Sequence, residues 1–261
     1  MDAKRTIVLV ALLALAVGCA SADGPSNVLL YDDSTALQVG RSALNQLGWS
    51  YTVGDHTTLN GLLTGGTSWE LVLFDCPSWK PQTGGSSDLG PLTNYVNGGG
   101  RAVVSFWDLD QYSGLATALG VGVYQDFFDP KNVYRWDATD PVFSGVTDLT
   151  QWRSSAWVDN GDLLTASSGT VALGGFTATA EPNSAAIVRG NSGRTYVNGF
   201  LFDDAASSGA GFDNMVQLVA NECLLASGRE PSADDSPELA TWVLLLSTGA
   251  IGSALRRRRR A

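Results

Sequence analysis

Short apolar runs that alternate with helix-like segments fill the first half of the chain. Three of these runs, at residues 27–31, 70–74 and 101–106, read NVLLY, ELVLF and RAVVSF. Apolar runs of this length, bounded by polar residues, are typical of strands buried on both faces of a parallel sheet. Strands that are separated by helices predict an α/β fold in which right-handed crossovers place helices on both faces of the sheet.

The first helix is predicted directly after the first of these runs. The Asp-Ser pair at 33–34 suits the cap of its first turn. Leu37, Leu44 and Leu47 then form an apolar stripe at helical spacing, and Gly48 ends it. Residues 33–48 are therefore expected to form a capped amphipathic helix against the sheet.

The remaining segments extend the same pattern. Residues 49–53 read as a second strand, and residues 112–119 and 214–226 as helices. Residues 121–190 are rich in Gly, Asp, Trp and Thr, and residues 194–202 read as a strand that rejoins the sheet. The expected body, residues 26–228, is thus a doubly wound, mostly parallel α/β sheet.

The N-terminal residues 1–22 have the layout of a secretory signal peptide for the Sec export machinery. Lys4 and Arg5 precede an apolar run at 7–17, and Ala20-Ser21-Ala22 fits a small-residue cleavage site. A second interpretation is open, because residues 16–19 resemble a lipoprotein box in which Cys19 would be lipidated. Either interpretation predicts an exported protein.

The C-terminal residues 237–261 contain three parts in a fixed order. Pro237 and Glu238 come first, an uncharged apolar run at 239–255 follows, and five arginines at 256–260 come last. The run reaches the roughly 17–25 residues that a transmembrane helix needs. The arginines favour the cytoplasmic side.

This tail resembles the PEP-CTERM sorting signal of exosortase substrates, although Leu239 stands where that family usually has a second proline. The resemblance implies exosortase as a partner, a membrane stage through the C-terminal helix, and a final place in the cell envelope, at the cell surface or outside the cell. A plain C-terminal membrane anchor is the alternative. Residues 229–236 form a polar linker before the tail.

The charge of the body argues against nucleic acid as a partner. The formal net charge is −10, and seven of the 16 basic residues lie in the two terminal segments. Nucleic-acid binding depends on neutralising phosphates with Lys and Arg, which the body largely lacks. An acidic domain tolerates divalent cations such as calcium, while solubility alone also explains the charge.

The body, over residues 27–228, resembles the class I glutamine amidotransferase-like fold, which is flavodoxin-like. The resemblance rests on the order of elements and on strand ends such as VLLYDD and ELVLFDCPSW. It implies a site above the carboxyl ends of the strands. In that family a nucleophilic Cys follows a central strand, but the matching turn at 107–110 reads WDLD, and the only histidine, His56, comes early. A Cys–His pair for acyl transfer is therefore not expected.

Carboxylates follow several of the predicted strands. Because carboxyl ends of parallel strands share one edge, these side chains are expected to gather there and to bind a ligand or a hard cation such as calcium. Helix capping and turn formation are the alternative roles. A second acidic turn lies at 159–162. The candidate site residues are Asp32, Asp33, Asp75, Asp108, Asp110 and Asp203, with Asp204 beside the last.

Two cysteines remain in the body after the signal peptide, Cys76 and Cys223. In an oxidising compartment they could form a disulfide, and two separate buried thiols are the alternative. A catalytic role for Cys76 would need His56 as its base.

Aromatic residues and the two terminal signals complete the functional prediction. Exposed Trp residues beside carboxylates suit sugar stacking, and the candidates are Trp79, Trp107, Trp136, Trp152 and Trp157. The sequence predicts an exported, exosortase-sorted surface or matrix protein with a non-catalytic α/β domain and an adhesion or exopolysaccharide-associated role. The alternative is a glycan or ester hydrolase that uses strand-end carboxylates, with or without calcium.

Overall fold

The computed structural model describes residues 24–32, 37–77, 89–147, 149–150, 160–205 and 210–231. Outside these ranges lie the predicted signal peptide with Cys19, the site candidate Asp33, and the predicted sorting tail with Pro237 and Glu238. Among the described residues, none of the helices has the length and apolar character needed to cross a membrane. The predicted transmembrane helix at 239–255 falls in the undescribed part of the chain.

One half of the sheet is parallel and contains the strands that the sequence predicted. Its strands run side by side in the order β2-β1-β3-β4-β11, and every neighbouring pair is parallel. The late strand thus rejoins the sheet beside β4, as expected. The strands are β1 (Val28–Asp32), β2 (Tyr51–Gly54), β3 (Leu71–Cys76), β4 (Ala102–Phe106) and β11 (Thr195–Asn198).

The other half is antiparallel, which corrects the prediction of a mostly parallel sheet. From β11 the sheet continues through β10, β9 and β6 to β7, and β8 and β5 extend it beside β10. Antiparallel neighbours need only short turns, which suits this Gly-rich part of the chain. The strands are β5 (Val121–Phe127), β6 (Asn132–Arg135), β7 (Leu149–Thr150), β8 (Gly161–Ala166), β9 (Val171–Gly175) and β10 (Ala185–Gly190).

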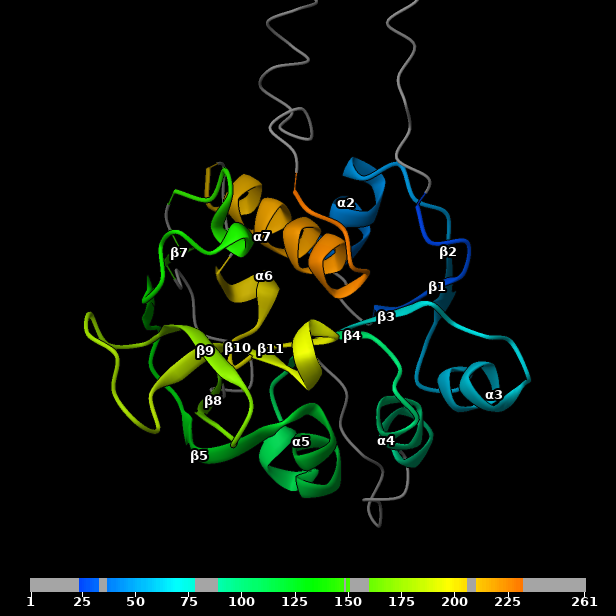
Figure 1. Cartoon of the computed structure of the whole chain (residues 1–261), viewed down its shortest axis with the longest axis horizontal. Coiled ribbons are helices and arrows are strands. Elements are labelled where there is room, and N and C mark those ends of the chain that lie inside the picture. The colour runs from blue at the N-terminus through cyan, green and yellow to red at the C-terminus, as the bar shows by residue number, and fades with distance from the viewer. Residues whose placement is uncertain are drawn as a thin grey trace, which may run out of the picture.

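Helices cover both faces of the parallel half (Figure 1). One face carries α2 (Val39–Gln46), α6 (Phe202–Ala205) and α7 (Ala210–Ala226). The other carries α3 (Leu59–Thr64), α4 (Gly90–Asn97) and α5 (Ser113–Leu119). Three single-turn helices, η1 (Leu109–Gln111), η2 (Pro141–Phe143) and η3 (Asn191–Gly193), lie in the connections.

Alternation along each central strand divides the core into two hydrophobic clusters. Leu71 and Leu73 of β3 belong to the cluster under α2 and α7, whereas Val72 and Phe74 belong to the cluster under α4 and α5. Because both faces are apolar, the strand has no polar alternation. This explains why the apolar runs were reliable markers of the parallel strands.

The start of α2 differs from the prediction, and its end agrees with it. The helix begins at Val39, and the residue before it, Gln38, has a left-handed backbone with φ of 53° and makes no side-chain cap. Leu37 therefore lies before the first residue of the helix, and its partly buried side chain packs against the cluster under α2 and α7. Gly48 has φ of 67°, the conformation that a helix-ending glycine supplies.

Candidate functional site

The carboxyl ends of the parallel strands carry a row of four buried polar side chains, here called the polar row. Strand pairing places Asp32 beside Asp75, Asp75 beside Ser105, and Ser105 beside Asn198. All four residues are buried, on strands whose same-side neighbours face α2 and α7. Two of the predicted strand-end carboxylates are thus brought together, as the sheet geometry requires.

Both carboxylates of the polar row are held by α2. Arg41 Nε donates to Asp32 Oδ2 at 2.6 Å, and the backbone N–H of Gly40 donates to Asp75 Oδ2 at 3.2 Å. The first turn of a helix favours negative charge, because its N–H groups point outward there. Asp32 and Asp75 therefore fasten α2 to the sheet.

Ser105 links the end of β4 to the segment between β11 and α6. Its hydroxyl donates to the Phe200 carbonyl at 3.0 Å and accepts from the Phe202 N–H at 3.4 Å. These contacts join β4 to the segment that follows β11. The serine is fully buried and acts as a structural link.

Asn198 connects the polar row to a buried acid on α7. Its side-chain Nδ2 donates to Glu222 Oε2 at 2.9 Å, and Glu222 is fully buried. Burial raises the pKa of Glu222 from 4.5 to about 8, and the bond from Asn198 offsets part of that rise. Near neutral pH this carboxyl is therefore mostly protonated. Neither Asn198 nor Glu222 was identified from the sequence as part of the edge, since a lone Glu on an amphipathic helix gives no such signal.

The other predicted strand-end acids do not join the polar row. Asp108 is half-buried and directly precedes η1. Asp203 is buried in α6 just beyond β11. Asp33 lies outside the described residues, and the side chain of Asp204 is not described either.

A separate group of three carboxylates, here called the acidic cluster, lies beyond the ends of β4 and β11. Asp110 of η1, Asp126 of β5 and Asp162 of β8 each offer an oxygen, and these oxygens lie within 4.8 Å of one another. The Leu109 N–H donates to Asp162 Oδ2 at 3.2 Å, and Asp162 N–H donates to the Gly199 carbonyl at 3.0 Å. These bonds position the cluster beside the carboxyl ends of the parallel strands.

Two members of the acidic cluster repel each other. Burial, followed by the negative charge of Asp126, raises the pKa of Asp110 above its usual value. A divalent cation would offset this repulsion, and three carboxylate oxygens in one place are the ligand type that calcium prefers. The described residues contain no other group of three or more such ligands.

The sequence placed only part of this cluster. Asp110 was a predicted site residue, whereas Asp162 was assigned to a separate acidic turn and Asp126 was not identified. Strand pairing brings them together, because Asp126 lies opposite Asp162 in the β5–β8 ladder. Gly161 has φ of 133°, and a side chain there would collide with the Gly199 carbonyl, so glycine lets β8 approach the sheet end closely.

The two cysteines and the histidine lie in places that separate them from one another. Cys76 and Cys223 are buried in the two different clusters on opposite faces of the sheet, and no disulfide joins them. This placement agrees with the alternative of two separate buried thiols. His56 is exposed in the turn after β2.

Two of the five tryptophans considered for sugar stacking can be placed, and both are partly buried. Trp107 and Trp136 pack against the cluster under α4 and α5. The Trp136 indole N–H also donates to the Thr177 carbonyl at 2.8 Å. Packing explains both rings, and Trp79, Trp152 and Trp157 lie outside the described residues.

Comparisons with known proteins place the fold and leave the activity open. No family model and no curated protein matches the chain. Among solved structures, a glutamine amidotransferase from Methylobacillus flagellatus matches with a TM-score of 0.52 at 8% identity, over 80% of this chain and 97% of that one. The body therefore has a class I glutamine amidotransferase-like fold, as its element order suggested.

Two weaker similarities accompany this match. A glutamine amidotransferase from Thermotoga maritima gives a TM-score of 0.42 at 14% identity, over 72% of this chain and 79% of that one. The carbohydrate deacetylase Agd3 gives a TM-score of 0.49 at 18% identity, over 78% of this chain. The chain spans only 33% of the length of Agd3.

Proposed function

We propose that this protein is an exported surface or matrix protein, sorted by exosortase, whose amidotransferase-like domain is non-catalytic and serves an adhesive or exopolysaccharide-associated role. One observation supports it above the others. The turn after β4, where the resembling family carries its nucleophile, reads Trp107-Asp108-Leu109-Asp110, and the chain's single histidine is exposed after β2. The domain keeps the scaffold and lacks the acyl-transfer groups.

The placement of the thiols supports the same proposal. Cys76 is buried at the end of β3, and Cys223 is buried in α7, where burial raises the pKa of its thiol well above the usual value. Reactive cysteines need an accessible thiolate that a neighbouring positive group stabilises. Neither thiol is accessible in this way, because both are buried.

Export and sorting rest on the two terminal segments. The signal peptide and the tail with Pro237, Glu238 and the arginine cluster are sequence features. From these segments we infer the proposed partners, the Sec machinery and exosortase. They also lead to the proposed localisation, at the cell envelope or outside the cell.

The decisive experiment measures the intact mass of the protein recovered from the native envelope and from the medium. Trimming near residue 22 and near Pro237 is the expected result. A chain that retains residues 237–261 would identify the tail as a plain membrane anchor and would remove the main support for sorting.

A hydrolase is the second candidate, and the acidic cluster is the observation that favours it. Paired carboxylates at short separation can act as acid and base on glycosides, and a raised pKa suits the acid. Turnover of ester or glycosidic substrates that is abolished by Asp110→Asn would replace the non-catalytic proposal. Asp129→Asn is the matched control, because Asp129 is exposed and lies outside the cluster.

A further inference from the structure

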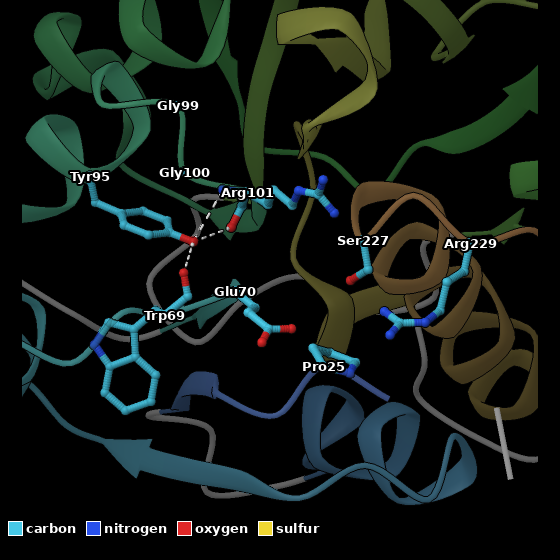
Figure 2. Close-up of a pocket in the computed structure, with 9 residues that line it drawn as sticks. All are labelled: Pro25, Trp69, Glu70, Tyr95, Gly99, Gly100, Arg101, Ser227 and Arg229. Carbon is cyan, nitrogen blue, oxygen red and sulfur yellow. Dashed lines mark hydrogen bonds between the residues drawn. The ribbon is translucent and has the colours of Figure 1, made fainter. Parts of the chain in front are cut away.

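A hollow of about 360 Å³ lies at the opposite edge of the sheet, where β1, β3 and β4 begin. Such a volume is at the lower end of the ~300–1,000 Å³ range of small-molecule sites. Figure 2 shows the side chains of Arg101, Glu70, Ser227 and Arg229 ending around one open space. We call it the arginine hollow, and its polar lining is Glu70, Tyr95, Arg101, Ser227 and Arg229.

The Arg101 guanidinium makes no hydrogen bond or ion pair with any described residue, although its backbone is firmly held. The Arg101 N–H donates to the Tyr95 hydroxyl at 3.1 Å, and that hydroxyl donates to the carbonyls of Arg101, at 3.1 Å, and Trp69, at 3.3 Å (Figure 2). By contrast, Arg41 and Arg189 are paired with Asp32 and Asp140. Arg101 therefore lines the hollow with a guanidinium that no described residue binds.

Ser227 supplies a second unused polar group. Its Oγ is buried and has no hydrogen-bond partner among the described residues. Buried polar atoms of this kind normally have a partner, because leaving one unsatisfied costs about 1–3 kcal/mol. A bound ligand would supply the missing partner.

Positive charge continues along this edge into a neighbouring hollow of about 350 Å³. Arg101 lines both hollows, and Arg189 and Arg194 line the second. The Arg194 side chain is exposed and also makes no hydrogen bond or ion pair within the described part of the chain. Of the nine basic residues outside the two terminal segments, four thus line this edge, in a chain whose net charge is −10.

We propose that the arginine hollow binds a uronic acid unit of an acidic polysaccharide. A guanidinium matches the two oxygens of a carboxylate with parallel hydrogen bonds. The Glu70 carboxylate can accept hydrogen bonds from the sugar hydroxyls, and the Ser227 hydroxyl can donate to them or accept from them. The inference rests on the proposed exopolysaccharide role only for the polymeric source of the sugar.

Glu70 favours a sugar monoanion over a phosphate or sulfate. Its oxygens accept from the Ser26 hydroxyl at 2.7 Å and from the Ser26 N–H at 3.3 Å, which holds the carboxylate at the rim. A multiply charged anion without donor hydroxyls would be repelled by this carboxylate. A uronate brings one negative charge and several hydroxyl donors, so it satisfies both Arg101 and Glu70.

The test is calorimetric titration of the full chain with D-glucuronate at low salt and at 0.15 M salt. D-glucose is the neutral probe, and acetate and phosphate are the probes without sugar hydroxyls. Arg101→Gln is the test variant, and Arg135→Gln is its control, because it removes the same charge from β6, away from the hollow. Arg101→Gln is expected to weaken glucuronate binding about 10- to 100-fold, the size of a lost charge-assisted contact.

Each result decides the proposal. Glucuronate binding that exceeds glucose and acetate binding, and that Arg101→Gln alone weakens, supports it. Equal binding of acetate or phosphate would overturn the sugar assignment, and equal effects of the two arginine variants would overturn the site. Both outcomes are independent of whether the tail is trimmed in the cell, so a failure here leaves the sorting proposal standing.

Discussion

The two edges of the parallel sheet carry opposite charges and use them differently. At the carboxyl edge the acids are tied into the fold, since Asp32 and Asp75 bind α2 and Asp162 binds the Leu109 N–H. At the amino edge the side chains of Arg101 and Arg194 make no hydrogen bond or ion pair with a described residue, and they line open hollows. Ligands in open α/β sheets usually lie at the carboxyl edge. In this protein, several acids at the carboxyl edge hold helices and loops in place. The charged side chains that no described residue binds, Arg101 and Arg194, lie at the other end of the strands.

The largest expected effect tests how far the carboxyl edge has become structural. Glu222→Gln keeps a partner for Asn198 and removes an acid whose pKa is raised to about 8. The folded state holds this proton up to about pH 8, whereas the unfolded chain releases it near 4.5. Wild-type stability therefore falls as pH rises from 4.5 to 8, by on the order of a few kcal/mol. The variant should lack this loss.

Denaturant unfolding of both proteins at pH 4.5 and pH 8.5 measures the effect. The variant should match the wild type at the lower pH and exceed it at the higher. Parallel pH profiles would show that Glu222 is charged and solvated in the folded protein, which would contradict its burial.

The acidic cluster is the part of the carboxyl edge that is expected to respond to a ligand. Calcium at about 100 times its Kd should raise the melting temperature by about 5–10 °C if the cluster binds it. Asp110→Asn should abolish that shift. Without calcium the same variant should be slightly more stable near neutral pH, because it removes a charge that is partly buried and that Asp126 repels.

Asp129→Asn controls for the loss of one negative charge, since Asp129 is exposed and outside the cluster. Thermal unfolding in EDTA and in calcium separates the two effects. If the wild type shows the same melting temperature in both, the cluster is a structural group like the polar row.

The same substitution, serine to alanine, can be made at both edges of the sheet, and its effects on stability can be compared. Ser105→Ala removes the hydroxyl that bonds the Phe200 carbonyl and the Phe202 N–H, so it should cost about 1–3 kcal/mol. Ser227→Ala removes a buried hydroxyl without a described partner, so it should be neutral within about 0.5 kcal/mol or slightly stabilising. Denaturant unfolding gives both values.

The same two variants distinguish a role of the serine in stability from a role in ligand binding. Ser227→Ala should weaken glucuronate binding while Ser105→Ala leaves it unchanged in the folded protein. A large stability loss at Ser227 would mean that its hydroxyl serves the fold, and the amino edge would then resemble the carboxyl edge.

The sequence predicted the parallel half of the fold because burial on both faces leaves an unmistakable pattern. Residues 71–74 are apolar throughout, as both hydrophobic clusters require, and Gly48 and Gly120 end their helices with positive φ. The sequence did not predict the individual strands of the antiparallel half. These strands are short, their apolar and polar residues alternate, and they depend on pairing partners that are distant in the chain. The start of α2 was misplaced because a left-handed Gln38 has no sequence signature.

The site was predictable only where it follows from strand ends. Asp32 and Asp75 meet because parallel strands share an edge, and the sequence marks both positions. Asp126 joins Asp162 through a ladder whose register includes a shift between Val123 and Gln125. The arginine hollow is harder still, because its lining comes from five segments that are separate in sequence, and only the fold brings them together.

The smallest expected effect concerns the one imidazole of the chain. His56 is exposed in the turn after β2, so His56→Gln should change stability by less than about 0.5 kcal/mol. It should also leave glucuronate binding and the calcium shift unchanged, because neither edge is expected to use a histidine. Thermal unfolding and calorimetric titration of the variant measure this. A ligand affinity that falls in the variant while its stability is unchanged would place His56 at a binding site. A third functional region, at the end of β2, would then stand beside the structural acidic edge and the ligand-binding basic edge.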